Sequence, residues 1–268
     1  MATKKEPQCF SLVDKKAVPL LEPHWPAPLN VKACVSTRMG GKSVFPFDSM
    51  NLALHVEDDP ATVELNREIL ANAIGQKLTD FQWLEQVHGT KIVAAKHAQN
   101  AERADGVWTS APGLVCAVMT ADCLPVLLCN AKGTKVMAVH AGWRGLAADI
   151  VAKAAQMFDS SEEVLAWMGP AIGPQHFEVG AEVREAFLAM NATYDQAFFA
   201  ATTSASSKKK YFADIYQLCR TQLALVGVAG TQVYGGEACT YSDQTKFYSY
   251  RRDGKRSGRM ASLIWLAP

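Results

Sequence analysis

The sequence lacks the features that would direct it to a membrane, out of the cell or onto nucleic acid. It contains no run of about 18 apolar residues, the length a membrane-spanning helix needs. Its first residues, MATKKEPQCF, carry charge but not the apolar segment of a signal peptide. The 27 Lys and Arg residues nearly balance the 26 Asp and Glu residues, so the net charge of +1 gives no electrostatic reason to bind nucleic acid or an anionic membrane. We therefore expect a soluble, cytoplasmic protein that acts on small molecules.

Cysteine and histidine patterns are equally sparse. The seven cysteines are an odd number, are irregularly spaced and include no Cys-x-x-Cys pair. This pattern is typical of reduced thiols rather than a disulfide framework, and most of them are expected in the core. The six histidines include no His-x-His pair. There is also no coiled-coil seam and no exposed apolar helix face, so we expect a monomer.

The apolar pattern predicts a mixed architecture in one domain, residues 1–268. Short apolar runs bounded by turn residues predict strands at 31–38, 91–96, 113–120, 125–130, 135–140 and 164–170. Helical spacing predicts helices at 146–158, 182–190 and 213–228, and another after the acidic cap Asp58-Asp59-Pro60. Asp253-Gly254 between two apolar arms predicts a C-terminal hairpin, and the polar segment 201–210 predicts a mobile surface loop. The expected fold class is α/β or α+β, with layered mixed sheets flanked by helices.

Three segments place a metal-capable side chain at or near the end of an apolar run. LEQVHGT carries His88, MTADCLP carries Cys123 and MAVHAGWRG carries His140. Two imidazoles and one thiolate suffice for an open, catalytic Zn²⁺ site with a fourth position for water or substrate. Taken singly, each residue type is more often a buried or turn residue. Polar neighbours, Asp122 and Gln86, supply groups that would orient ligands or substrate.

Several ordered segments together resemble the YfiH family, the laccase-domain or polyphenol-oxidase proteins. They are STRMGG, NLALHVEDDP, HGT after LEQV, ADGVWTS, MTADCLPVLL, VHAGWRGL, MGPAIGP and FYSYRRDGKRSGRM. The resemblance implies an α/β fold related to the cysteine-hydrolase-like toxin domain and a zinc site at His88, Cys123 and His140. It also implies phosphorolysis of adenosine, inosine and methylthioadenosine, with an adenosine deaminase activity at the same site.

The family name also implies copper oxidation, which the histidine count does not support. A multicopper oxidase needs a dense supply of imidazoles, usually in His-x-His pairs, and this chain has six histidines and no such pair. We therefore expect Zn²⁺, with copper as the alternative ion at the same three ligands.

Phosphorolysis of a nucleoside needs cationic groups to hold inorganic phosphate against C1′, and Arg binds phosphate oxygens bidentately. The candidates are Arg38 in STRMGG, Arg144 in GWRG, and Arg251 or Arg259 in the basic C-terminal run. Nearby glycines, Gly40, Gly41, Gly142 and Gly145, would let backbone N–H groups approach an anion. Further candidates for ribose or base contacts are Asn51, His55, Gln86, Trp108, Trp143 and Phe177, and Cys239 is a candidate for the pocket wall. Each also has a plain structural interpretation as a cap, a surface pair or a core residue.

Two other functions compete with nucleoside phosphorolysis. The family resemblance also suggests a hydrolase that removes wrongly incorporated serine from a UDP-MurNAc peptidoglycan precursor, with Cys123 as a nucleophile activated by imidazole. A non-enzymatic binding module would use the 201–210 loop and the basic hairpin, and it would leave the His-Cys-His set unexplained.

Overall fold

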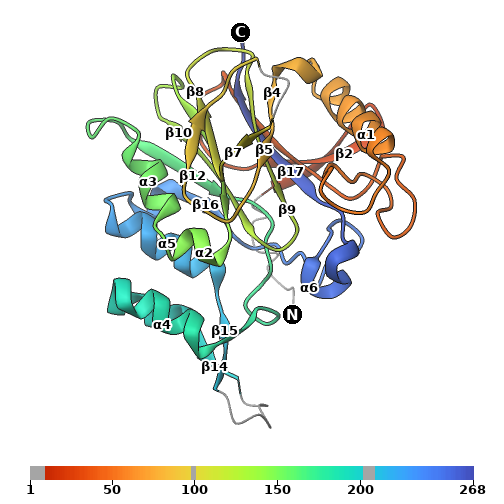
Figure 1. Ribbon diagram of the computed structural model, residues 1–268. Helices are drawn as coiled ribbons and strands as arrows, with labels where there is room; N and C mark the ends of the chain where they lie inside the picture. The colour runs from red at the N-terminus through yellow and green to blue at the C-terminus, as the bar shows by residue number, and fades with distance from the viewer. Residues whose placement is uncertain (1–9, 98–100, 202–208) are drawn as a thin grey trace, which may run out of the picture.

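The computed structural model describes residues 10–97, 101–201 and 209–268, and two six-stranded sheets packed against each other form its centre (Figure 1). The first sheet has the order β1 (Phe10–Lys15), β2 (Val18–Pro23), β3 (Val31–Ser36), β17 (Met260–Leu266), β9 (Val115–Thr120), β4 (Phe81–Gln82). The second has the order β16 (Val233–Gly235), β12 (Val164–Met168), β10 (Leu124–Asn130), β11 (Val136–Ala141), β8 (Gly106–Thr109), β6 (Ile92–Ala94). Antiparallel pairs predominate, and β4–β9, β6–β8 and β12–β16 are parallel. The mixed-sheet prediction is therefore confirmed.

The central strands are buried on both faces, which explains their uninterrupted apolar sequences. Every residue of β10 and β11 is buried. Because side chains alternate along a strand, Leu127 and Ala138 face the first sheet, where they share a core with Val118 and Ile264. Their neighbours on the opposite face, such as Leu128 and Val139, belong to a second core shared with the helices. The alternating-polarity signal of a half-buried strand is therefore absent from these segments.

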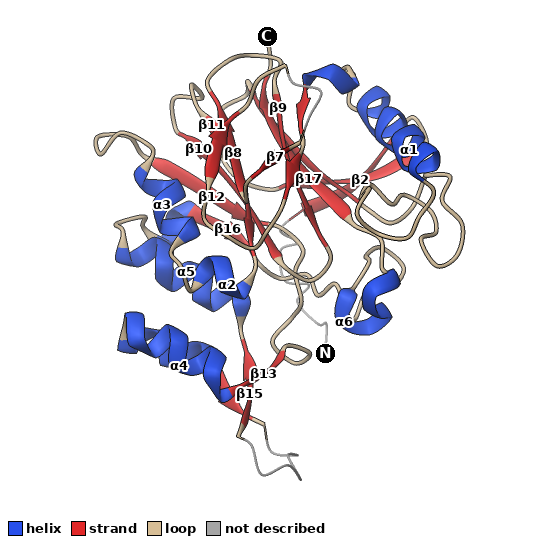
Figure 2. Ribbon diagram, viewed as in Figure 1, coloured by secondary structure: helices blue, strands red, loops and turns tan. Residues whose placement is uncertain are grey.

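Helices flank the sheets (Figure 2). They are α1 (Pro60–Ala73), α2 (Trp143–Leu146), α3 (Ile150–Gln156), α4 (Ala181–Met190), α5 (Ile215–Leu225) and α6 (Tyr250–Asp253). Helix α1 covers the first sheet, while α3 and α5 pack on the second. As predicted, Asp59 caps α1 by accepting a hydrogen bond from the Thr62 N–H, and Pro60 is its first residue. Within the described residues, none of the helices has the length and apolar character needed to cross a membrane.

Short elements complete the fold. A three-stranded sheet contains β13 (Glu178–Gly180), β15 (Lys210–Ala213) and β14 (Phe198–Ala200), and β5 (Leu84–Glu85) pairs with β7 (Glu102–Arg103). The 3₁₀ turns are η1 (Leu78–Asp80), η2 (Ala192–Ala197), η3 (Gly230–Gln232) and η4 (Gly254–Arg256). Of the loop predicted at 201–210, residues 202–208 lie outside the described residues, and Lys210 begins β15.

Two predictions of local structure are wrong. The helix predicted at 146–158 is divided between α2 and α3, because Asp149 has a left-handed φ of 67° that no continuous helix accommodates. The C-terminal hairpin is absent: Ser249 caps α6, η4 follows at Gly254, and only the last arm is a strand. That arm, β17, pairs with β3 and β9 in the centre of the first sheet. The Asp-Gly pair thus correctly marks a turn, but the turn joins a short helix to a strand.

Candidate metal and substrate site

The structure brings together the three candidate metal ligands from three separate segments. His88 lies in the loop between β5 and β6, Cys123 directly precedes β10, and His140 lies near the end of β11. Their ligand atoms all lie within 4.8 Å of one another. In the part of the chain that the structure describes, this is the one group of His, Cys, Asp or Glu side chains with a geometry suited to a metal ion.

Two of the turns at this site have a left-handed backbone. Asp122, in the link that carries the chain from β9 of the first sheet to β10 of the second, has a φ of 86°, and His88 has a φ of 58°. Such conformations are uncommon for non-glycine residues and persist only where surrounding contacts hold them. The buried carboxylates of Asp105 and Asp122 supply those contacts by accepting hydrogen bonds from neighbouring N–H and O–H groups.

The carboxylate of Asp105 organises both histidines. One oxygen accepts a hydrogen bond from the Nδ1–H of His140 at 2.8 Å and from the backbone N–H of His88 at 2.9 Å. The other accepts the backbone N–H groups of Val87 and Gly89 at 3.3 and 2.6 Å. Burial opposes ionisation of Asp105, but the hydrogen bonds from His140 and these N–H groups outweigh it and lower the pKa of the carboxyl. This arrangement fixes the His140 tautomer, so that its Nε2 is the nitrogen available to a metal.

Cys123 and His140 each favour the charged form of the other. Burial opposes ionisation of the thiol, but His140 and His88 outweigh it and lower the pKa of Cys123 to about 6. Burial also opposes protonation of His140, yet Cys123 and Asp105 raise its pKa to about 9. The sulfur lies 3.8 Å from Nε2 of His88, and the two imidazoles meet edge to face with centroids 4.8 Å apart.

Gly142 packs tightly against two of the candidate ligands. A Cβ atom at this position would lie 3.0 Å from Cδ2 of His88 and 3.1 Å from Sγ of Cys123. The glycine therefore lets the strand end close against two of the three ligands. Its predicted role as an anion-binding N–H group receives no separate support, because α2, which starts at the next residue, has only four residues.

The donor set fits one zinc ion. Two imidazoles and a thiol whose pKa is lowered match the open catalytic type of zinc site, and Asp105 orients His140 as a carboxylate does behind many zinc-bound histidines. The set does not fit multicopper chemistry: all six histidines are in the described residues, and only His88 and His140 enter a potential metal cluster.

The three candidate ligands lie in the wall of a cavity of about 440 Å³, a size typical of small-molecule sites. Its polar lining comprises His55, Gln86, His88, Asp122, Cys123, His140, Arg144, Arg251 and Arg259, and its apolar lining comprises Met119, Ala121, Trp143, Ile172, Phe177, Ile215 and Tyr250. Of the lining residues, Asp122 carries the one carboxylate, and it is already bound. The cavity is therefore cationic.

Three arginines face this cavity: Arg144 from α2, and Arg251 and Arg259 from the C-terminal segment before β17. Arg259 precedes β17 and is the most enclosed of them; its Nη1 donates to the carbonyls of Ser257 and Gly258 at 2.6 and 3.0 Å. Burial lowers the pKa of the Arg259 guanidinium, which nevertheless stays charged at neutral pH. Arg144 is exposed and lies over the Trp143 ring at 4.5 Å. Arg251 comes from α6.

Asp122 and Arg252 anchor the segment that carries Arg251 and Arg259. The Asp122 carboxylate accepts hydrogen bonds from Thr240 at 2.6 Å, from Ser249 at 3.0 Å and from the Arg251 N–H at 2.6 Å. This carboxylate thus ties the turn before Cys123 to α6.

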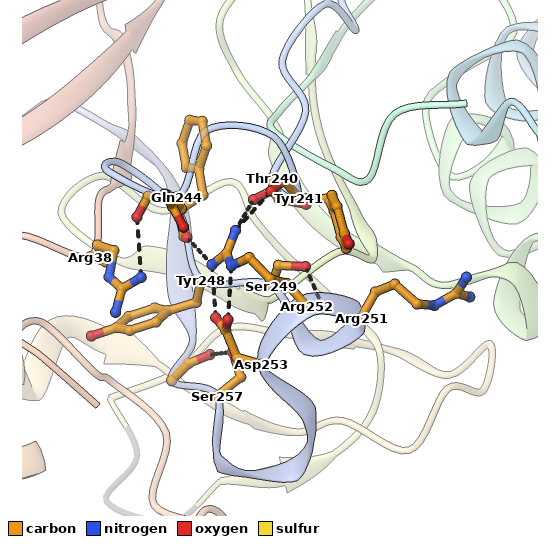
Figure 3. Close-up of polar contacts among 12 residues, drawn as sticks. Arg38, Thr240, Tyr241, Gln244, Tyr248, Ser249, Arg251, Arg252, Asp253 and Ser257 are labelled. Carbon is orange, nitrogen blue, oxygen red and sulfur yellow. Dashed lines mark hydrogen bonds and ion pairs between the residues drawn. The ribbon is translucent and has the colours of Figure 1, made fainter. Parts of the chain in front are cut away.

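The two adjacent arginines of α6 have different surroundings. The Arg252 guanidinium donates to the carbonyls of Thr240, Tyr241 and Phe247 at 2.9 to 3.0 Å and pairs with Asp253. Figure 3 shows Arg251 extending away from this network. Arg252, a member of the basic C-terminal run, is therefore an internal clamp, and Arg251 is the one of the two that faces the cavity.

Arg38 does not line the cavity. Its guanidinium donates to the carbonyls of Asp48 and Gln244 at 3.0 and 3.1 Å and lies 4.8 Å from the Tyr248 ring centroid (Figure 3). A structural role explains its contacts: it joins the loop after β3 to the C-terminal segment. The adjacent Gly41 is needed for packing, since a Cβ there would lie 2.3 Å from the Ser49 carbonyl.

Asn51 and Trp108 are also outside the cavity lining. Asn51 is fully buried, binds Asp58 at 2.8 Å and accepts the Arg259 N–H at 3.0 Å, so it acts behind the wall. Trp108 packs in the core, with Lys135 over its ring. By contrast, Gln86 is in the lining, but its amide is bound at both ends by the Met119 backbone at 2.7 Å.

Sequence reasoning did not single out Asp105 or Tyr250. Asp105 belongs to the ADGVWTS segment, and its position directly before a buried strand is the feature by which the sequence could have indicated a functional carboxylate. Tyr250 lies beside the predicted turn and looked like part of a hairpin arm. His55, Trp143 and Phe177, in contrast, do line the cavity.

Comparison with known proteins gives consistent matches over nearly the whole chain. The family model described as multi-copper polyphenol oxidoreductase laccase matches residues 32–267. A relative from Shigella flexneri, named purine nucleoside phosphorylase YfiH, is 53% identical over 249 residues, covering 92% of this chain and 98% of the relative. The crystal structure of the Neisseria meningitidis protein NMB0706 is 42% identical with a TM-score of 0.84, covering 93% of this chain and 99% of the other. YlmD from Geobacillus stearothermophilus is 28% identical with a TM-score of 0.87, covering 98% and 100%.

Proposed function

This chain belongs to the multi-copper polyphenol oxidoreductase laccase family, and from that membership we propose that it is a zinc-dependent purine nucleoside phosphorylase. One observation carries the proposal: a His-Cys-His ligand set and three arginines line the same cavity, whose one lining carboxylate is already bound. Such a cavity favours a substrate anion next to the ligand set. The name of the Shigella flexneri relative supports inorganic phosphate as that anion.

The arginines hold the phosphate in this proposal. Arg259 is the main phosphate ligand, because it is the most enclosed of the three and keeps donors beyond the Nη1 that binds Ser257 and Gly258. Arg144 and Arg251, at the more exposed parts of the wall, complete the cationic surface. Together they offset the charge on phosphate as its oxygen approaches C1′ of the ribose and the bond to the purine breaks.

Aromatic and aliphatic side chains hold the nucleoside. Trp143 and Phe177 offer ring faces for a purine, and Ile172 and Ile215 exclude water that would otherwise compete with phosphate. Adenosine, inosine and methylthioadenosine are the proposed substrates, since stacking tolerates differences among purine bases.

His88, Cys123 and His140 would hold Zn²⁺, which supplies Lewis acidity for polarising a substrate oxygen or for activating water toward C6 of adenine. The second of these reactions is the proposed adenosine deaminase activity. His55 lines the same cavity, and burial together with the neighbouring Arg259 lowers its pKa, so it is a neutral imidazole able to accept a proton at pH 7.

Product analysis tests the proposal. The purified protein, with its metal content measured in the same preparation, is incubated with adenosine in phosphate buffer and in phosphate-free buffer. Free adenine that forms only with phosphate, at about one zinc per chain, is the expected result. Inosine formed equally in both buffers, with no free base, would support the deaminase activity and contradict the phosphorylase activity.

A second candidate function is a hydrolase in which Cys123 is the nucleophile and not a metal ligand. Cys123, His140 and Asp105 are ordered as a nucleophile, a base and an orienting carboxylate, the arrangement of cysteine hydrolases. The substrate would be a UDP-MurNAc peptidoglycan precursor carrying serine in error. Alkylation separates the two: iodoacetamide reacts with Cys123 at once if it is a free nucleophile, whereas stoichiometric zinc protects a ligand.

A further inference from the structure

Six cysteines lie in the described part of the chain, and two of them differ from the rest. The four buried ones are Cys34, Cys116, Cys129 and Cys219, and burial raises the pKa of each thiol well above its usual value. Cys123 and Cys239 are only partly buried, and each lies within hydrogen-bond distance of an imidazole. Cys123 belongs to the metal site. Cys239 does not, and no function proposed above uses it.

Cys239 lies between an imidazole and a backbone N–H. Its Sγ lies 3.5 Å from Nδ1 of His176 and accepts the Gly173 backbone N–H at 3.2 Å. The His176 ring is held by stacking on Tyr241, with centroids 4.4 Å apart and planes at 20°. Ser242 Oγ lies 3.4 Å from the same Nδ1. The imidazole can accept the thiol proton, and the N–H stabilises negative charge on sulfur.

The segment with Ala171 and Gly173 packs closely against the segment with Cys239 and brings the Gly173 N–H to the sulfur. Cys239 and Ala171 form an isolated parallel β-bridge, in which the Thr240 N–H donates to the Ala171 carbonyl at 2.9 Å. A Cβ on Gly173 would lie 3.0 Å from Sγ and 3.1 Å from Cβ of Cys239. A larger residue here would therefore push the Cys239 side chain away from its present position by a few tenths of an ångström.

We propose that Cys239 and His176 form a second reactive site, at which a small-molecule disulfide exchanges with the protein thiol. The Cys239 sulfur attacks one sulfur of the disulfide while its proton passes to His176. The disulfide bond breaks, a protein mixed disulfide forms, the second half leaves as a thiolate, and the proton is released to solvent. The reverse exchange with a free thiol restores Cys239.

The mixed disulfide would change the substrate cavity. Gly173 and His176 flank the cavity-lining Ile172 and Phe177 in sequence, and Arg251 Nη1 donates to the His176 and Glu178 carbonyls at 3.4 and 3.0 Å. A group attached to Cys239 displaces this segment and the arginine it holds. This consequence rests on the proposed function, whereas the thiol exchange itself does not.

The exchange is tested with 5,5′-dithiobis(2-nitrobenzoate), which releases one coloured thiolate per thiol modified. Every protein carries Cys9→Ser, because Cys9 lies outside the described residues, and every protein is zinc-loaded so that Cys123 is protected. We expect one rapid equivalent, absent from Cys239→Ser and slowed at least about tenfold in His176→Gln, which lacks the basic imidazole. Ser242→Ala is the matched control, since it changes another neighbour of Nδ1 and should leave the rate undiminished.

A rapid equivalent that persists in Cys239→Ser, or an equal rate in His176→Gln, overturns the proposal. Thermal unfolding and zinc content of each variant identify any that fail to fold. Phosphorolysis by the modified protein is measured separately, before and after reduction with dithiothreitol. If rapid exchange occurs without any effect on turnover, the reactive site stands and its coupling to the cavity is excluded.

Discussion

The metal-ligand side and the arginine side of the cavity are built in different ways. Two candidate ligands, Cys123 and His140, lie at the ends of adjacent strands whose pairing sets their positions, and Asp105 holds the third, His88. Arg251 and Arg259 come instead from a segment containing only α6, η4 and turns. Side-chain clamps hold that segment in place. The backbone ladder thus fixes one half of the site, and individual side chains fix the other.

This difference predicts that the two halves can be broken separately. Changes on the ligand side should alter zinc binding first, and changes on the arginine side should alter phosphate binding while zinc stays bound. Asp122 is the contact between them, because it precedes Cys123 and accepts the Arg251 N–H.

His140→Ala should have the largest effect. It removes a ligand, so zinc affinity should fall by more than about 100-fold and turnover should be lost, since three protein ligands define this type of site. Metal analysis and a nucleoside assay on the dialysed protein measure both. His97→Ala is the matched control, because His97 is exposed at the surface near Asp80. Full metal content and activity in His140→Ala would remove it from the ligand set.

Arg259→Gln should raise KM for phosphate by about 100-fold, because a buried charge-assisted hydrogen bond contributes roughly 1.5–3 kcal/mol. Zinc content should not change. The comparison variant is Arg256→Gln, whose side chain is 62% exposed and is not among the cavity-lining residues. Equal KM values for the two variants would show that Arg259 does not bind phosphate and would leave Arg144 and Arg251 as its ligands.

Asp105→Asn should weaken zinc binding by about 10- to 100-fold, the usual cost of losing a carboxylate behind a metal-bound histidine. Competition with a chelator of known affinity measures the change. At saturating zinc, KM for phosphate should stay at the wild-type value. A raised KM for phosphate under those conditions would mean that the two sides are not independent.

Arg252→Met should have the smallest effect on chemistry. Its guanidinium binds three carbonyls and Asp253, so losing it should lower the free energy of unfolding by about 1–3 kcal/mol. Denaturant unfolding measures this loss. Zinc affinity should be unchanged, and KM for phosphate should rise by less than about tenfold, through Arg251 alone. A loss of zinc would contradict the separation of the two sides.

The same difference explains what could be predicted from the sequence. His88, Cys123 and His140 follow from apolar runs that end in metal-capable residues, since strand pairing brings such ends together. The roles of Arg252 and Asp105 could not be predicted, because both depend on carbonyl and N–H groups that only the folded chain places around them. Arg38 illustrates the reverse error: its glycine-rich surroundings suggested an anion site, but its acceptors are backbone carbonyls. Short helices such as α6 leave too little periodicity to be distinguished from a hairpin arm.

Transfer of label from ³²P-phosphate tests most directly whether both sides act in one reaction. The zinc-loaded protein is incubated with inosine and labelled inorganic phosphate, and hypoxanthine and sugar products are separated and counted. We expect one labelled ribose 1-phosphate for each hypoxanthine released. Hypoxanthine accompanied by unlabelled free ribose would show that water, not phosphate held by the arginines, attacks the nucleoside.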